Sequence, residues 1–513
     1  MTVRSATSLQ DTLVRLLVRF FRAEWSGALL AIVILAVSIE LATSGKPFFH
    51  PSNLMTILNN SAAIGIVAGG MTLVILTAGI DLSVGSVMGM TAALTGYVAS
   101  FWGFPPFLAI TTGLCLGALI GLFHGSLIAQ FGMPAFIVTL AGLSIWRGTG
   151  HLSTGAQATP KLPETFDWFG RFNPLSPIRD AYKSGDLPGW LNWLGSFLDE
   201  HWLSYFRTFQ MSMIIFILFF IVIALIVSNT AYGRYIYAIG SNETGARQAG
   251  INTVRYKMMT YVFCSLSAAL GALLFLGRAP YAKSDYGQMW ELDAIAAVVI
   301  GGTSLFGGRG TIWGTFMGVI LLKLINNGLT LAQLNTFWQM IVTGMIILIA
   351  VGLDIVRQSR DPEAVRKFLA AVGAALAFFT LMTPASFVLR SAITMHEHNS
   401  VAALKDSGVK LAGGQNARLL SPAEFEAMQA SVSAHLLPSL ICLILVVICV
   451  VAAVRPGRTE AMVATGLCVV TAIAMALVGL AGTIPFLILA MIVISSSMFV
   501  RNMFDRARDL NET

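Results

Sequence analysis

Residues 70–90 read GMTLVILTAGIDLSVGSVMGM, a stretch in which a single carboxylate, Asp81, stands among apolar residues, glycines and serines. The sequence on both sides of it is apolar as well. Backbone that leaves the helical form inside a membrane is tolerated only where it packs against protein or lines a polar cavity. This stretch therefore predicts an interrupted helix within a membrane protein.

Composition supports a membrane location for the rest of the chain. The 513 residues are 56% hydrophobic and 11% charged, and their mean hydropathy is +0.77. A soluble domain carries about 25% charged residues. The apolar runs are continuous and reach the roughly 20 residues that a spanning helix needs. They do not alternate as the strands of a membrane β-barrel do. We predict an all-α, polytopic integral membrane helical bundle.

Three regions follow from hydropathy and charge. Residues 1–24 predict a cytoplasmic amphipathic segment, residues 25–357 a transmembrane core, and residues 358–513 an extension. Lysines and arginines near the apolar runs place both termini in the cytoplasm by the positive-inside rule, with the loops 151–208 and 390–435 outside. The expected core spans are 25–43, 55–78, 82–102, 105–130, 134–150, 209–228, 258–278, 292–307, 311–330 and 334–352, and the extension adds 368–389, 436–454, 461–481 and 483–500.

Several kinds of chemistry have no motif in this sequence. It contains no GxxxxGK[ST] loop for nucleotide phosphates and no GxSxG or HExxH pattern. We therefore expect no enzyme activity, no cofactor and no metal site. Polar residues within membrane spans mark solute pathways by default, so transport is the function class that the sequence favours.

Two glycine-rich interruptions resemble each other, TAGIDLSVGS at 77–86 and VIGGTSLFGGRGTIWG at 299–314. Interrupted segments in corresponding halves of a transporter point to an internal repeat and to its substrate path. The alternative is that these glycines serve close helix packing. The candidate path residues are Gly79, Asp81, Ser83, Gly85, Ser86, Gly301, Gly302, Thr303, Ser304, Gly307 and Gly308.

Asp81 has three possible roles. It can cap a helix that starts at Leu82 or Ser83 by accepting backbone N–H bonds, and this is the role that we favour. Contact with a solute hydroxyl and coupling to a proton are the alternatives that the sequence leaves open.

The basic cytoplasmic segment 229–257 contains a further candidate. A short helix is expected from Asn242 to Ala249, closed by Gly250, and it could dock a cytoplasmic motor protein. An ordinary solvated loop is the alternative. The residues assigned to this coupling loop are Asn242, Glu243, Ala246, Arg247 and Gly250.

The stretches GMTLVILTAGIDLSVGSVMGM (70–90), GRYIYAIGSNETGARQAGIN (233–252) and ELDAIAAVVIGGTSLFGGRGTIWGTFMG (291–318) resemble one known family. It comprises the membrane permease subunits of bacterial ATP-binding cassette importers for monosaccharides such as ribose, xylose and arabinose. The stretches MPAFIVTLAGLSIWRGTG (133–150) and NTFWQMIVTGMIILIAVGLD (335–354) are most similar to the xylose type.

The resemblance implies a multi-pass permease of the bacterial inner membrane that works as a homodimer. It implies two cytoplasmic ATP-binding subunits, which hold the ATP and dock on residues 242–250, and an extracytoplasmic sugar-binding protein. It implies no role for nucleic acid. An ion-coupled secondary sugar transporter, or a polyol or hexose as substrate, is the alternative. The resemblance ends near Asp354 and leaves the role of residues 358–513 open.

Overall fold

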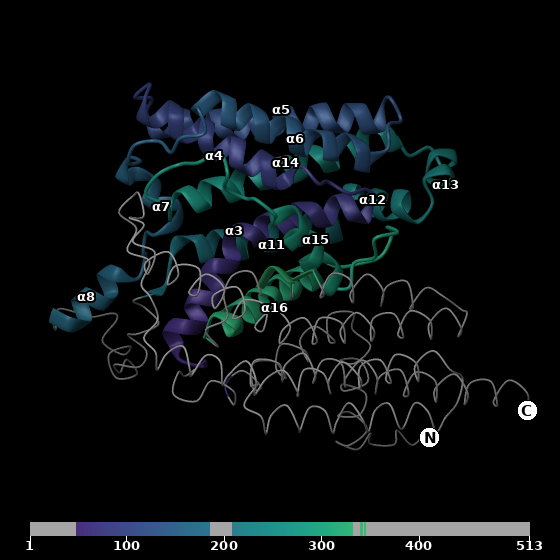
Figure 1. Cartoon of the computed structure of the whole chain (residues 1–513). Helices are drawn as coiled ribbons and strands as arrows, with labels where there is room; N and C mark the ends of the chain where they lie inside the picture. Colours follow the sequence, from purple (N-terminus) through teal and green to yellow (C-terminus); the bar gives the residue numbers. More distant parts are fainter. Residues whose placement is uncertain (1–39, 41–47, 185–207, 332–338, 342, 345–513) are drawn as a thin grey trace, which may run out of the picture. The chain divides into compact units, whose positions relative to one another are not determined.

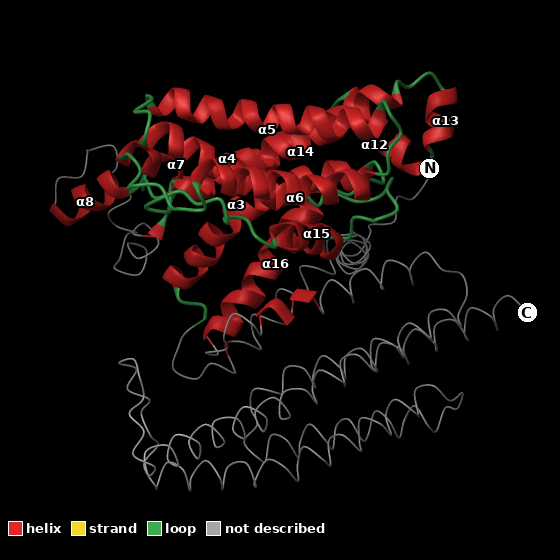
Figure 2. Ribbon diagram, turned by 45° about the horizontal axis from the view of Figure 1, so that its top comes forward, coloured by secondary structure: helices red, strands yellow, loops and turns green. Residues whose placement is uncertain are grey.

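A computed structural model describes Glu40 and residues 48–184, 208–331, 339–341 and 343–344. All of them belong to Met1–Asp354, the first of two units into which the chain divides. The regular structure of these described residues is helical, without any strand (Figures 1 and 2). This agrees with the predicted all-α class.

The helices of the described part differ greatly in length. Several are as long as a membrane is thick, whereas others have only one to three turns. Their bounds are α3 (Pro51–Leu76), α4 (Val84–Ser100), α5 (Pro106–Ala129), α6 (Ala135–Thr154), η1 (Glu164–Phe166), α7 (Asp167–Gly170), α8 (Ser176–Ser184), α11 (Met211–Asn229), α12 (Ala231–Ser241), α13 (Glu243–Gln248), α14 (Thr253–Leu276), α15 (Trp290–Ile300) and α16 (Ile312–Leu331).

Each predicted span between 55–78 and 311–330 meets one of these helices. Five of the helices, α3, α5, α11, α14 and α16, are long and apolar enough to cross a membrane. The predicted span 292–307 is wrong in its extent, because α15 already ends at Ile300. The predicted spans 25–43 and 334–352, the segment 1–24 and the extension 358–513 lie outside the fully described residues.

Proline and glycine set several helix ends. Pro51 and Pro106 occupy the first turns of α3 and α5, where a missing N–H removes no helical hydrogen bond. Gly155 ends α6 with φ 59°, a left-handed conformation that glycine adopts without a steric penalty.

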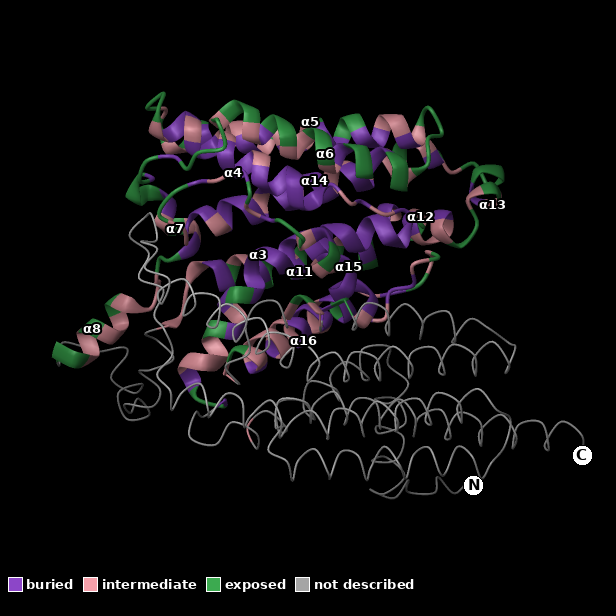
Figure 3. Ribbon diagram, in the orientation of Figure 1, coloured by how far each residue is buried: buried purple, intermediate pink, exposed green. Residues whose placement is uncertain are grey.

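Helix α14 lies at the centre of the described bundle and contacts α3, α4 and α5. Glycines on α5 allow a close approach to α14. A Cβ atom at Gly121 would lie 2.6 Å from the Tyr261 carbonyl oxygen, and one at Gly125 would lie 2.9 Å from the Met258 Cα. Small residues in this spacing let two helix backbones pack closely in membranes. Figure 3 shows that α3 is mostly buried, whereas α5 has an exposed outer face.

Helices α3 and α16 run antiparallel and are joined by side-chain hydrogen bonds. Asn53, near the start of α3, exchanges two amide hydrogen bonds of 3.1 Å and 2.9 Å with Asn327, near the end of α16. Further along, the hydroxyl groups of Thr72 and Thr315 lie 2.8 Å apart, and both residues are fully buried. These two pairs fix the register of the helices.

The two ends of the described bundle are built differently. Helices α12 and α13 lie at one end, and α7 and α8, from the predicted loop 151–208, lie at the opposite end (Figure 1).

Candidate functional site

The first interruption is shorter than the sequence indicated. It runs from Thr77 to Ser83, between the last residue of α3 and the first residue of α4. Ala78 adopts the left-handed φ of 59° there. Gly85 and Ser86 were predicted to belong to the interruption, but they lie in the first turn of α4. Ser86 bonds within this turn, because its hydroxyl donates to the Ser83 carbonyl oxygen over 2.7 Å.

Asp81 holds the turn through Ser83. Its Oδ1 atom accepts the Ser83 backbone N–H over 2.9 Å and the Ser83 hydroxyl over 2.6 Å, and both residues are fully buried. The predicted helix start at Leu82 or Ser83 is wrong, because α4 begins at Val84 with Ser83 as the capping residue. Asp81 thus accepts the N–H of the cap residue, an Asx turn, instead of being the cap.

A buried chain of hydrogen bonds leads from α6 to this carboxylate. The Trp146 indole N–H donates to His124 Nε2 over 2.9 Å, and His124 Nδ1 lies 3.3 Å from the Ser83 hydroxyl. An indole only donates, so His124 Nε2 must be the acceptor and Nδ1 carries the proton. The donors then point in one direction, from Trp146 through neutral His124 and Ser83 to Asp81, which accepts at the end.

Two glycines make room around this chain. A Cβ atom at Gly142 would lie 2.4 Å from His124 Nε2, and a Cβ atom at Gly79 would lie 2.5 Å from the Tyr261 hydroxyl. Tyr261 and Cys264 are buried on α14 within electrostatic range of Asp81. The absence of a side chain at Gly142 and at Gly79 thus lets His124 and Tyr261 pack closely near Asp81.

The second interruption runs from Gly301 to Thr311, between α15 and α16. Gly302, Gly307 and Gly308 have φ values of 88°, 81° and 70°, which side chains other than glycine rarely adopt. The buried Ser304 closes a local turn, because its N–H donates to the Arg309 carbonyl oxygen over 3.0 Å. Thr303 is buried beside it, and Gly301 packs closely against α16.

The two interruptions meet at the end of the bundle that carries α13. The Gly308 N–H donates to the Leu76 carbonyl oxygen over 3.0 Å, which ties the second interruption to the last residue of α3. Helix α12 packs onto this contact: a Cβ atom at Gly240 would lie 1.9 Å from the same carbonyl oxygen and 2.5 Å from the Gly308 nitrogen. The Tyr237 hydroxyl donates to the Gly310 carbonyl oxygen over 2.7 Å. We call this contact of Leu76, Gly240 and Gly308 the junction.

The short helix predicted from Asn242 to Ala249 is present as α13 (Glu243–Gln248). The Asn242 side chain accepts the Gly245 N–H over 2.9 Å and so caps its start. At its end Gly250 has φ 83°, and the N–H groups of Gly250 and Ile251 donate to the carbonyl oxygens of Arg247 and Ala246. This is a Schellman motif.

Two charged side chains of α13, Glu243 and Arg247, take part in ion pairs. Glu243 pairs with Lys257 over 2.9 Å and with Arg247 over 3.5 Å. Ala246 is buried, whereas Gly250 and much of the helix are exposed. Because Ser241 precedes α13 and lies against Gly308, α13 follows the junction directly along the chain.

A third non-helical segment, residues 277–289, lies outside the candidate sites predicted from the sequence. It joins α14 to α15 and packs on α4, where a Cβ atom at Gly85 would lie 2.3 Å from the Gly287 carbonyl oxygen. Arg147 of α6 donates from Nη1 to the carbonyl oxygens of Ser284 and Tyr286 over 2.7 Å and 2.9 Å. The polar composition of this segment was its only signal in the sequence.

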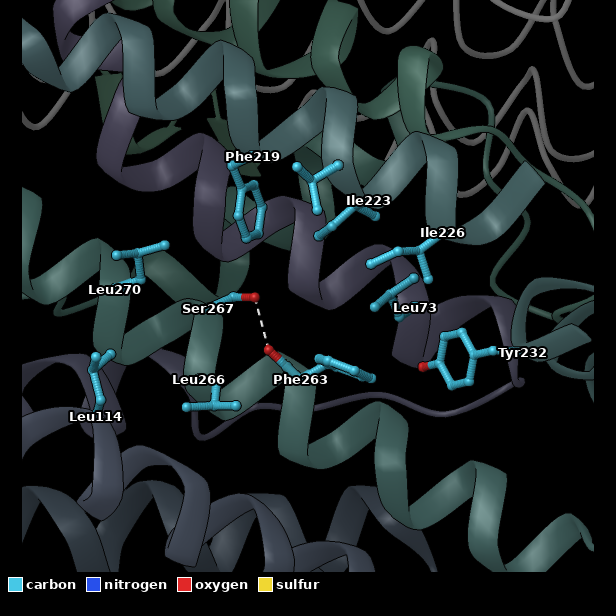
Figure 4. A pocket seen from close by; sticks show the side chains of 11 residues that line it. Leu73, Leu114, Phe219, Ile223, Ile226, Tyr232, Phe263, Leu266, Ser267 and Leu270 are labelled. Atoms are coloured by element: carbon cyan, nitrogen blue, oxygen red, sulfur yellow. Dashed lines mark hydrogen bonds between the residues drawn. The ribbon is translucent and has the colours of Figure 1, made fainter. Parts of the chain in front are cut away.

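The described part also contains an apolar pocket of about 320 Å³ away from the interruptions (Figure 4). Two lining residues carry hydroxyl groups: Ser267, which donates to the Phe263 carbonyl oxygen over 2.7 Å, and Tyr232, whose hydroxyl is buried without a hydrogen-bond partner among the described residues. The other lining residues are apolar. A polar solute would lose hydrogen bonds on entering such a pocket. The lining residues are Leu73, Leu114, Phe219, Val222, Ile223, Ile226, Tyr232, Phe263, Leu266, Ser267 and Leu270.

Residues 53–351 match the model of one protein family, described as branched-chain amino acid transport system, permease component. The ribose import permease protein of Escherichia coli (strain K12) is 36% identical over 338 residues, which cover 66% of this chain and 96% of that relative. The ribose import permease protein of Bacillus subtilis (strain 168) is 37% identical over 331 residues, covering 64% and 92%.

The xylose transport system permease protein of Escherichia coli (strain K12) is 32% identical over 361 residues, which cover 64% of this chain and 91% of that relative. These relatives do not distinguish the xylose type that the sequence favoured from the ribose type. No solved structure matches the chain.

Proposed function

Since this chain belongs to the family of permease components of the branched-chain amino acid transport system type, we propose that it imports a monosaccharide. It is the membrane permease subunit of an ATP-driven, binding-protein-dependent importer, and it is not an enzyme. The observation that carries this assignment is the family match from residue 53 to residue 351, which includes α16 and nearly all of α3.

The cargo follows from the relatives. The family description names branched-chain amino acids, but the relatives with the coverage given above are named for ribose and xylose. A fructose import permease protein of Rhizobium meliloti is 31% identical over 357 residues, covering 69% of this chain and 91% of that relative. We assign a neutral monosaccharide as cargo, and among monosaccharides we favour a pentose over a hexose.

Three partners complete the transporter: a cytoplasmic ATPase, an extracytoplasmic sugar-binding protein and a second copy of the permease. The ATPase supplies the energy, and the binding protein delivers the sugar. We assign the ATPase to α13, because α13 is a capped and charged helix at one end of the bundle. That end then faces the cytoplasm, and both termini lie on the same side. The permease acts as a homodimer with two ATP-binding subunits, and ATP is bound by those subunits.

The two interruptions control the path. Their residues Gly79, Asp81, Ser83, Gly301 and Ser304 are buried, so we assign them to the turns beside the path. Gly85 admits the third segment against α4, and Ser86 stabilises the first turn of α4 through its bond to Ser83. The path on the side of the junction is shaped by Gly302, Thr303, Gly307 and Gly308.

Reconstitution in proteoliposomes with the ATPase and the binding protein tests this function. We expect uptake of radiolabelled ribose or xylose that requires ATP and persists when ionophores collapse the ion gradients. Uptake of leucine alone would overturn the sugar assignment. Uptake that ionophores abolish while ATP is present would favour the ion-coupled alternative.

A further inference from the structure

The third segment, residues 277–289, descends along α4. Its Ala282 faces Gly96, where a Cβ atom would lie 2.3 Å from the Ala282 Cβ, and its Gly287 faces Gly85 in the first turn of α4. The distance along α4 from Gly96 to Gly85 is about 16 Å at 1.5 Å per residue. From the end of α4 at Ser100, Gly85 lies about 22 Å along the helix on the same scale. The hydrocarbon core of a membrane is about 30 Å thick, so the segment enters it.

The inner side of the segment is held firmly. Besides the two bonds from Arg147 to its carbonyl oxygens, the Ser284 hydroxyl lies 2.7 Å from His151 Nδ1. Gly89 makes room for this clamp, because a Cβ atom there would lie 2.4 Å from the Ser284 carbonyl oxygen. Ala282, Ser284 and Gly287 are buried. The segment is therefore a built part of the fold.

The outer side of the segment is polar and exposed. Tyr281, Asp285 and Gln288 all point away from the packed interior, and Tyr281 is 39% exposed. A carboxylate at this depth does not face hydrocarbon, because an intramembrane charge faces a protein interior or a water-filled cavity. Non-helical backbone at membrane depth follows the same rule. The exposed edge of 281–288 thus faces a water-filled cavity or another protein surface, and not lipid.

We propose that this edge binds the hydroxyl groups of the monosaccharide as it passes through the permease, with Asp285 and Gln288 as the contacts. The inference rests on the proposed function and extends it to a specificity site outside the two interruptions. A carboxylate accepts two hydroxyl hydrogens, and an amide both donates and accepts. The Lys283 ammonium lies 5.2 Å from the centroid of the Tyr281 ring and adds a hydrogen-bond donor beside Tyr281. Because the contacts are exposed, they hold the sugar weakly and release it.

The test uses the whole transporter in proteoliposomes and the variants Asp285→Asn and Gln288→Ala. The matched control is Asp180→Asn, which changes an exposed carboxylate on α8. We expect each test variant to lower uptake per ATP hydrolysed by about tenfold, the equivalent of one lost hydrogen bond to the sugar. The ratio of ribose to xylose uptake shifts as well, because the two pentoses place one hydroxyl differently. ATPase stimulation by the loaded binding protein stays normal.

The outcomes separate the two hypotheses. Wild-type liposomes that take up no monosaccharide would overturn the proposed function itself. Normal wild-type uptake together with unchanged uptake and sugar preference in both variants would overturn the inference alone. A variant that loses membrane level or ATPase stimulation in parallel with uptake would also overturn it, because that result indicates a structural role.

Discussion

Replacing Asp81 by asparagine or by alanine separates a role in holding the turn from a role of its charge towards a solute or a proton. Asp81 accepts two hydrogen bonds from Ser83 at Oδ1, and it is fully buried. Hydrogen bonds to a charged group contribute roughly 1.5–3 kcal/mol each, so alanine removes on the order of 3–6 kcal/mol from the turn. Asparagine keeps an acceptor oxygen in place. Both bonds then persist as neutral ones, and the loss falls to about 2 kcal/mol.

If Asp81 only holds the turn, Asp81→Asn retains most of the uptake at a normal membrane level, with a modest fall in the melting temperature in detergent. Asp81→Ala then loses protein level, melting temperature and uptake together. The assay measures uptake in proteoliposomes normalised to folded protein from size-exclusion chromatography. Asp81→Asn protein that is fully folded but inactive would refute the reasoning, because the negative charge would then act on the cargo or a proton.

Three further predictions follow from the contacts around the interruptions. Trp146→Phe leaves His124 Nε2 without its donor, and we expect a loss of roughly 1–3 kcal/mol of stability, measured as a lower melting temperature; an unchanged melting temperature would contradict the hydrogen-bond chain. Gly240→Ala pushes a methyl group into the junction, so we expect uptake per ATP hydrolysed to fall while the ATPase still copurifies. The control is Gly148→Ala, because a Cβ atom at Gly148 would meet nothing within 4 Å. Gly250→Val forces a branched side chain into φ 83°, so ATPase copurification should weaken, and normal copurification would speak against docking at α13.

Short motifs predicted local structure well. Asn242 and Gly250 mark the two ends of α13 correctly, because capping depends only on residues within a turn of the helix. The glycines at 301–310 likewise predicted the second interruption, since a positive φ favours glycine wherever it occurs. Both features are encoded in a few neighbouring residues.

Contacts between distant segments could not be predicted in this way. Ser83 meets His124 on α5, and His124 in turn accepts a hydrogen bond from Trp146 on α6. Nothing in the sequence around these residues indicates that pairing. Similarly, Gly85 was taken for part of the interruption, because the sequence cannot distinguish a glycine that breaks a helix from one that admits a neighbouring backbone.

Hydropathy also misjudged where helices end. The span 292–307 remains apolar through Gly301 and Leu305, yet the backbone leaves the helix after Ile300. The reverse error occurred at 277–289, whose charged and polar residues resemble a surface loop although Gly287 packs against the first turn of α4. Hydropathy reports the polarity of side chains, and it does not register the path of the backbone.

The interface between α3 and α16 limits how this permease can move. The two helices are bonded near both ends, by Asn53 with Asn327 at one end and by Thr72 with Thr315 at the other. Beside the second pair, Gly308, which precedes α16, donates to the last residue of α3. Separating the helices would break all of these bonds within a low-dielectric interior, where unpaired polar groups are costly. The two helices therefore move as one rigid body, and the passage opens at interfaces between other helices. Spin labels placed on α3 and α16 should keep their separation throughout the ATP cycle.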